Sequence, residues 1–249
     1  MHSAEFRFYE ELNDFLPPER RKQSFLYAFA GTPAVKDAIE AQGVPHTEVD
    51  LILVNGLSVG FDYHLQPGDR VAVYPVFESL DIFPVSRVRP EPLRRIRFIA
   101  DVHLGKLARW LRLLGFDTTY RNNLADADII AIALELNRII LTRDLGLLKN
   151  KAVTHGYWVR ASIPGEQTRE VIQRFTLLRS AAPFSRCLEC NGGIEAIARA
   201  EAHKSVPPQV AAACDSFYRC QSCGRIYWQG SHHARLTERL KSLGLEPGA

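Results

Sequence analysis

An alternation of strand-like and helix-like segments across residues 94–144 constrains the fold more than any other feature of the sequence. Apolar runs such as RFIA and RIILT alternate with stretches such as LGKLARWLRLL and ADIIAIALEL, which carry apolar residues at helical spacing. Strands that alternate with helices predict a parallel sheet with helices on both faces. The alternation continues to residue 180, and we expect strands at 95–100, 117–121, 138–142 and 156–160 and helices at 104–114, 127–136, 145–150 and 166–179.

Three acidic residues of this segment, Asp101, Asp128 and Asp144, follow a strand or open the next helix. Ligands of open α/β sheets bind beyond the carboxyl ends of the strands, where all three acids are expected. Three carboxylates at one edge predict a site for Mg²⁺ or Mn²⁺, which prefer hard oxygen ligands. Helix capping and the helix dipole offer a plain structural explanation for each acid taken alone.

Other acids of the segment fit the site less well. Asp117 opens a strand and is expected at the opposite edge of the sheet. Asp126 suits the N-cap of the helix that follows it. Glu135 lies about two turns into that helix, which runs away from the edge. Asp126 or Glu135 could therefore serve only as a further, weaker ligand.

The charge of the chain is unevenly distributed. Residues 1–93 contain 8 Lys or Arg against 14 Asp or Glu, whereas residues 94–180 contain 15 against 8. A basic segment favours a polyanionic partner such as nucleic acid, although a solvated basic surface would give the same balance. Lys106 lies one turn after Asp101, where it could contact a phosphate or stabilise developing charge. The candidate substrate-binding residues at the same edge are Arg109, Arg121, Asn122 and Arg143.

All five cysteines lie in the last segment, residues 181–249. Four form two CxxC pairs, Cys187 with Cys190 and Cys220 with Cys223, which are separated by 29 residues. Each pair can provide half of a tetrahedral Zn²⁺ site, so we predict a structural zinc ribbon followed by a C-terminal helix. A redox dithiol is the alternative. We expect Cys214 to be a buried spare thiol. Tyr227 and Trp228, which follow Cys223, are expected to pack against the preceding domain, although an aromatic and basic mixture of this kind could also stack the bases of a single strand.

The first segment, residues 1–80, is predicted to run strand, strand, helix, strand, strand, strand, with the last two strands at SVGFDYHL and VAVYPVF. Pro33 suits the first position of the helix and Gly43 its end. His46 and His64 are expected at surface or turn positions. The Pro-containing stretch PVSRVRPEP follows, where the charge changes sign, and predicts a linker over residues 81–93.

The VNG turn and the PGDRVAVYPVF ending make residues 1–80 resemble a β-grasp, ubiquitin-like domain of the sulfur-carrier kind. Sulfur carriers end in a free Gly-Gly, whereas this segment continues into ESLDIFPVSRV. We therefore expect a docking or structural role, with a protein partner, rather than carrier chemistry.

The motifs FIADVHLGKLARWLRLLGFD and DADIIAIALELNRIILTRD, together with the cysteine pairs, resemble the PIN-like RNase family named after the C-terminus of the Mut-seven exonuclease. Bacterial members of that family also carry an N-terminal ubiquitin-like domain. The resemblance implies a PIN-like nuclease domain over residues 94–180, a metal-dependent ribonuclease activity, and catalytic roles for Asp101, Asp128 and Asp144. PIN nucleases often use a further acid on a middle helix, and its position in this sequence is open.

Two other functions fit the same sequence. A non-catalytic adaptor would bind RNA or a ribonucleoprotein through the PIN-like domain and a protein through the ubiquitin-like domain. DNA could also replace RNA as the substrate. The start MHSAEFRFYE lacks the profile of an export signal, and no run approaches the roughly 18–20 apolar residues of a membrane span. We therefore expect a cytoplasmic protein without a membrane partner.

Overall fold

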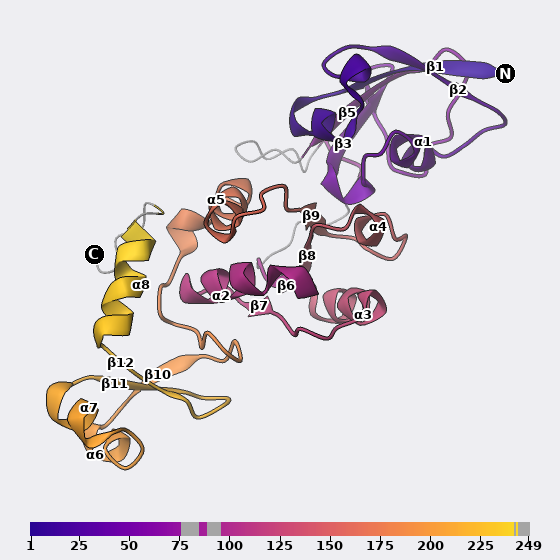
Figure 1. Ribbon diagram of the computed structural model, residues 1–249. Coiled ribbons are helices and arrows are strands. Elements are labelled where there is room, and N and C mark those ends of the chain that lie inside the picture. The colour runs from indigo at the N-terminus through magenta and orange to yellow at the C-terminus, as the bar shows by residue number, and fades with distance from the viewer. Residues whose placement is uncertain (76–84, 89–95, 242, 244–249) are drawn as a thin grey trace. The chain divides into compact units, whose positions relative to one another are not determined.

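The computed structural model describes residues 1–75, 85–88, 96–241 and 243 (Figure 1). The chain divides into two compact units, one of Met1–Arg95 with Asp126–Trp158 and one of Ile96–Ala125 with Val159–Ala249. Most of the linker predicted for residues 81–93 lies outside the described residues, as do the end of the strand expected at VAVYPVF and the C-terminal tail.

The strands and α-helices follow one another in the order expected for three segments. They are β1 (His2–Phe8), β2 (Phe25–Phe29), α1 (Val35–Ala41), β3 (Val49–Val54), β4 (Leu57–Ser58), β5 (Arg70–Pro75), β6 (Phe98–Ala100), α2 (Gly105–Leu113), β7 (Thr118–Thr119), α3 (Asp126–Leu136), β8 (Ile139–Thr142), α4 (Leu145–Leu148), β9 (Gly156–Trp158), α5 (Pro164–Arg174), β10 (Ile194–Ile197), α6 (Arg199–Ala202), α7 (Pro208–Ala213), β11 (Phe217–Cys220), β12 (Ile226–Trp228) and α8 (Ser231–Lys241).

The first segment forms a mixed five-stranded sheet in the order β2-β1-β5-β3-β4. The two strands β1 and β5 run parallel, and the other pairs are antiparallel. Ala4, Phe6 and Phe8 alternate along β1 and are buried, as are Ala38 and Ile39 of α1 in the same core. One helix packed on a mixed sheet is the β-grasp arrangement that the sequence predicted.

Some local predictions for this segment are wrong. Of the strand expected at SVGFDYHL, only Ser58 belongs to a strand, β4. The residues after it form a loop, in which the Asp69 carboxylate accepts hydrogen bonds from Tyr63 Oη at 3.0 Å and from the Gln66 N–H at 2.8 Å. The helix α1 begins at Val35 rather than at Pro33, since Ala34 keeps an extended backbone.

His46, which we expected at the surface or in a turn, is buried in a 3₁₀ turn, His46–Glu48. Its Nδ1 lies 2.6 Å from Glu40 Oε1, and its Nε2 lies 2.7 Å from the Val153 carbonyl oxygen. The Nζ of Lys149 donates to the Glu40 carbonyl at 3.3 Å. Within the first unit, residues 149–158 thus pack on the β-grasp fold and bury its histidine.

The middle segment forms a four-stranded sheet in the order β7-β6-β8-β9, with parallel pairing of β6 to β7 and of β8 to β9. Every residue of β6 and β8 is buried, as is typical of a parallel sheet with helices on both faces. This sheet confirms the predicted α/β class. The last helix, α5, ends at Arg174 rather than at 179, because Thr176 adopts a left-handed φ of 49° and a 3₁₀ turn follows.

The last segment forms an antiparallel sheet in the order β10-β11-β12, with α6 and α7 beside it (Figure 1). Its small core consists of Ala202, Val206 and Phe217, and Trp228 packs against this core. Among the described residues, no helix combines the length and the apolar content needed to cross a bilayer.

Candidate functional site

Asp101 directly follows β6 and opens the 3₁₀ turn Val102–Leu104. Its Oδ1 accepts a hydrogen bond from the His103 backbone N–H at 3.1 Å, and its carbonyl accepts one from the Leu104 N–H at 2.9 Å. Asp101 is only 5% exposed. Burial of a carboxylate is costly unless polar groups or a cation compensate for the lost water, so this residue suits a cation site.

The first turns of α2 present two predicted phosphate contacts, Lys106 and Arg109, and both are exposed. The Nη1 of Arg109 donates to Glu189 Oε1 at 2.8 Å. Lys106 forms no ion pair with any described residue. Lys106 is therefore the cation on this helix that an incoming phosphate could engage without displacing a carboxylate.

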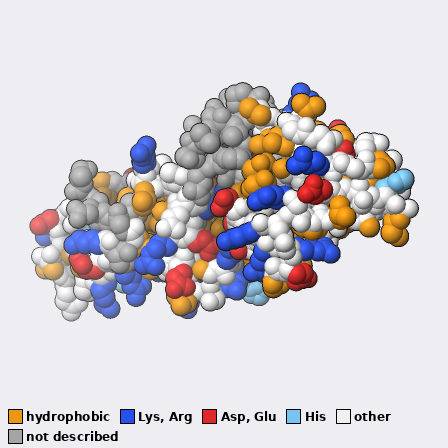
Figure 2. All heavy atoms as spheres, turned by 90° about the horizontal axis from the view of Figure 1, so that it is seen from above, with side chains coloured by type: hydrophobic (Ala, Val, Ile, Leu, Met, Phe, Trp, Pro, Cys, Tyr) orange, Lys and Arg blue, Asp and Glu red, His pale blue; other side chains and the backbone are white. Residues whose placement is uncertain are grey.

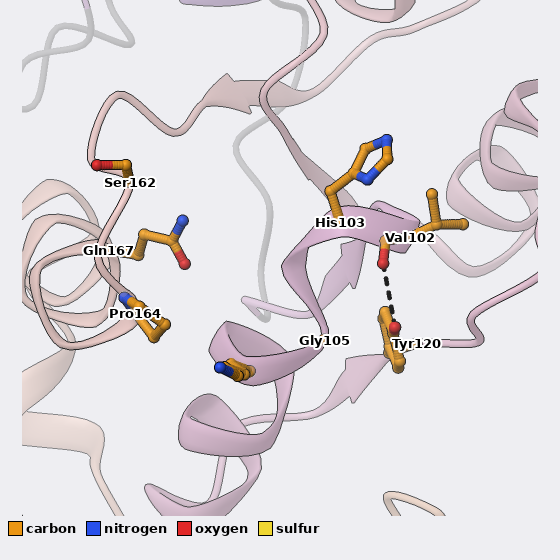
Figure 3. A pocket seen from close by; sticks show the side chains of 8 residues that line it. Val102, His103, Gly105, Tyr120, Ser162, Pro164 and Gln167 are labelled. Atoms are coloured by element: carbon orange, nitrogen blue, oxygen red, sulfur yellow. Dashed lines mark hydrogen bonds between the residues drawn. The ribbon is translucent and has the colours of Figure 1, made fainter.

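A pocket of about 590 Å³ opens beside the start of α2 (Figure 3). It is lined by Val102, His103, Gly105, Lys106, Tyr120, Ser162, Pro164 and Gln167. All of these residues belong to the second unit, and one of them, Val102, directly follows Asp101 in the chain. The hydroxyl of Tyr120 donates to the Val102 carbonyl at 3.1 Å, and its ring packs so closely on Gly105 that a Cβ there would lie 2.6 Å from the ring.

Asp128 and Asp144 belong to the first unit, and both are exposed. Asp128 lies in the first turn of α3, and Asp144 caps α4 by accepting a hydrogen bond from the Gly146 N–H at 2.7 Å. The capping explanation for Asp144 is thus realised, which leaves its other oxygen available to a ligand. Because Asp101 lies in the other unit, the convergence of the three acids remains a prediction.

The remaining predicted site residues occupy turns and helix surfaces. Arg121 and Asn122 are exposed in the turn after β7, and Arg143 is exposed between β8 and Asp144. Asp126 is the first residue of α3 rather than the residue before it, and Glu135 is exposed near its end. Their contacts with substrate or metal remain predictions. On the face drawn in Figure 2, Lys and Arg side chains lie among Asp and Glu side chains rather than in one unbroken basic patch.

The four paired cysteines form a single cluster, with all Sγ atoms within 4.8 Å of one another. The Cys190 and Cys220 sulfurs are 3.3 Å apart, and the Cys187 and Cys223 sulfurs are 3.7 Å apart. A tetrahedral zinc with Zn–S bonds of about 2.3 Å would place its sulfurs about 3.8 Å apart. The cluster could therefore bind a metal such as zinc.

The electrostatics of the cluster also suit a cation. Burial raises the pKa of Cys187, but hydrogen bonds from the Tyr227 hydroxyl and from the Cys190 and Glu189 backbone N–H groups outweigh it and lower that pKa to about 6. Burial and neighbouring thiols raise the pKa of Cys190 to about 12. Thiols that share one negative charge behave in this way, and a metal ion would favour the thiolate at all four positions.

Comparison with protein families matches residues 96–240 to the Mut7-C RNAse domain and residues 1–81 to the Mut7-C ubiquitin domain. The chain belongs to the Mut7-C RNAse family. The two matches confirm the predicted order, a ubiquitin-like domain followed by the Mut7-C domain. Comparisons with curated proteins and with solved structures gave no match. The Mut7-C match includes Asp101, the pocket and all four paired cysteines.

Within this Mut7-C domain, the first CxxC loop is fixed to α2 and to the start of β7. The guanidinium of Arg112, which is 4% exposed, donates to the carbonyls of Thr118, Leu188 and Glu189 at 2.8–3.1 Å. Asn191 accepts from the Thr118 N–H at 3.0 Å. The cysteine cluster and α2, which carries Lys106 and Arg109, are thus joined through buried polar contacts.

Sequence reasoning missed three pocket residues of the Mut7-C domain, Tyr120, Ser162 and Gln167. The helix expected at 166–179 already places Gln167 in its first turn, and Pro164, which occupies the first position of α5, where proline is favoured, supports that placement. The sequence holds no comparable signal for Tyr120, whose position depends on its contact with Gly105.

Proposed function

We propose that this protein is a metal-dependent ribonuclease that hydrolyses RNA phosphodiester bonds. The observation that carries the proposal is the buried carboxylate of Asp101 at the carboxyl end of β6, next to a pocket that also contains Lys106. A carboxylate and a cationic side chain at that end of a strand suit a phosphate-bearing ligand. Membership of the Mut7-C RNAse family supports RNA as the substrate.

In this proposal Asp101, Asp128 and Asp144 hold Mg²⁺ or Mn²⁺ through carboxylate oxygens. The cation, when bound, lowers the pKa of a water molecule and stabilises charge on the phosphate oxygens. Lys106 binds the phosphate and stabilises the charge that develops during attack. The RNA strand on either side contacts Arg109, Arg121, Asn122 and Arg143.

The other two segments have supporting roles in the proposal. Cys187, Cys190, Cys220 and Cys223 hold a structural Zn²⁺ in the segment 181–249, which has too small a core of its own to fold without metal. The ubiquitin-like domain, residues 1–80, is joined by the linker 81–93 and offers a docking surface to a protein partner. The nuclease domain occupies residues 94–180, and the protein acts in the cytoplasm.

A cleavage assay tests the catalytic proposal. Purified protein is incubated with single-stranded and structured RNAs, and with DNA of the same sequence, in Mn²⁺, in Mg²⁺ and in EDTA. The Asp101→Asn and Asp144→Asn variants are expected to lose cleavage. Asp215→Asn, which changes an exposed aspartate paired with Arg199, is the matched control and is expected to cleave normally.

Three outcomes contradict parts of the proposal. Cleavage that both Asp variants retain would exclude the acidic site, and cleavage of DNA in preference to RNA would change the substrate. RNA binding without cleavage, indifferent to divalent ions and to the Asp variants, would identify the protein as an adaptor.

A further inference from the structure

Gln167 is a buried polar residue on the wall of the pocket opposite α2. It lies in the first turn of α5, its backbone N–H donates to the Ile163 carbonyl at 2.9 Å, and it is 5% exposed. Figure 3 shows its amide group facing the space bounded on the other side by His103 and Gly105. A buried polar group that faces a pocket suits recognition of a bound molecule.

The orientation of this amide is fixed by the loop before α5. Its Nε2 donates to the Ala161 carbonyl at 3.1 Å. The Ala161 N–H is itself held by Glu170 Oε2 at 2.9 Å, and the Arg160 N–H by Glu170 Oε1 at 2.8 Å. Rotation of the amide by 180° would place two carbonyl oxygens against each other, so the Gln167 Oε1 atom remains on the pocket side.

The Gln167 Oε1 atom accepts no hydrogen bond from any described residue, and it can act only as an acceptor. A phosphate oxygen is also an acceptor and gains nothing from this atom. Lys106 lines the same pocket, and its ammonium group is where a phosphate is expected to bind. The ligand that matches both side chains carries an anionic group and, a short distance away, a hydrogen-bond donor.

A ribonucleotide has this pattern, because its 2′-hydroxyl can donate a hydrogen bond close to the phosphate, whereas a deoxyribonucleotide lacks that donor. We propose that Gln167 Oε1 accepts a hydrogen bond from one ribose 2′-hydroxyl of the substrate and thereby selects RNA over DNA. This inference rests on the proposed function, because it assumes that the pocket receives a nucleic-acid strand.

The test uses the full-length protein and one short single-stranded oligoribonucleotide. A series of oligonucleotides carries a single 2′-deoxy or 2′-fluoro nucleotide at successive positions, since neither substituent can donate a hydrogen bond. Loss of one neutral hydrogen bond is expected to lower kcat/KM by roughly two- to tenfold at one position of the strand. Guanosine-to-inosine changes, which remove a base amino group, test the base as the alternative source of the donor and are expected to have no effect.

Variants then assign the effect to Gln167. Gln167→Met keeps the length of the side chain without its carbonyl, and it is expected to cleave the all-ribose oligonucleotide as slowly as the substituted one. For this variant, the cleavage rate of the all-ribose oligonucleotide divided by that of the substituted oligonucleotide should fall to about one. Gln173→Met removes an exposed glutamine of the same helix and should leave the ratio unchanged.

Several results would overturn the inference. A wild-type protein that responds to no single 2′ substitution has no hydroxyl recognition. A Gln167→Met variant that slows all substrates equally would show that Gln167 only braces the loop before α5. If no oligonucleotide is cleaved, the proposed nuclease activity fails separately, and dissociation constants for the same series decide whether the 2′-hydroxyl is recognised.

Discussion

The backbone N–H of Trp158 donates a hydrogen bond to Glu48 Oε1 at 2.6 Å, although the two residues are 110 positions apart in the chain. Trp158 ends β9, the last strand in its sheet order, and Glu48 is fully buried in the β-grasp fold. The Trp158 ring also packs on Phe15 at 5.1 Å between centroids. An edge strand leaves backbone donors open to other chains, so the ubiquitin-like domain protects this edge by covering it.

Replacing Glu48 by alanine is expected to lower the free energy of unfolding by about 1–3 kcal/mol, because the Trp158 N–H would remain buried without its acceptor. Urea denaturation measures the loss, and hydrogen exchange of the Trp158 amide should become faster. Glu19→Ala, at an exposed position of the same domain, is the control and should change neither quantity. Equal effects of the two variants would show that the bond does not stabilise the interface.

Metal analysis of the purified protein should find one zinc per chain, held by the cysteine cluster. Cys190→Ser and Cys220→Ser each remove one of four thiolates and should lower the zinc content sharply. Cys214→Ser is a control within the same segment, because Cys214 lies outside the cluster. The Cys214→Ser variant should therefore keep its zinc. A zinc content that none of the cluster variants changes would contradict the assignment.

The buried guanidinium of Arg112 should stabilise the Mut7-C domain more than the exposed guanidinium of Arg109 does. Burial lowers the pKa of Arg112, and the nearby cysteines offset part of this effect. Three carbonyl oxygens accept hydrogen bonds from the Arg112 guanidinium. Arg112→Met leaves these carbonyls without their donor and should cost about 1–3 kcal/mol of unfolding free energy.

Arg109→Met is the matched variant, since it removes only a surface ion pair with Glu189, worth about 0–1 kcal/mol. Urea denaturation compares the two variants, and a chelator should remove zinc faster from Arg112→Met. Similar losses for both variants would show that the buried contacts of Arg112 do not hold the CxxC loop.

The sequence predicted the elements of the fold well because each depends on local patterning. The sequence shows the apolar residues that are buried in β6 and β8, and it shows the apolar face of α2. The spacing of the two CxxC pairs alone identified the cysteine cluster. The burial of His46 could not be predicted, because it depends on the packing of Val153, which lies 107 residues away. The pairing of Arg109 with Glu189 is equally invisible, since both residues suit a solvated surface.

The ion pair of Glu40 with His46 should make stability depend on pH. Burial alone would raise the pKa of Glu40, but the hydrogen bond and the charge of His46, with a smaller effect of Lys36, lower it below its usual 4.5. The folded protein therefore binds this proton more weakly than the unfolded chain does. The ionised Glu40 stabilises the fold above pH 4.5, and that stabilisation is lost as the pH falls through the lowered pKa.

Glu40→Gln should accordingly lower the urea midpoint at pH 7, by an amount that corresponds to about 1 kcal/mol, and the difference from wild type should shrink as the pH falls below 4.5 toward 3. Asp37→Asn removes an exposed carboxylate from the same helix and provides the control for a general change in charge. A difference between wild type and Glu40→Gln that is as large at pH 3 as at pH 7 would mean that ionisation of Glu40 does not stabilise the buried histidine.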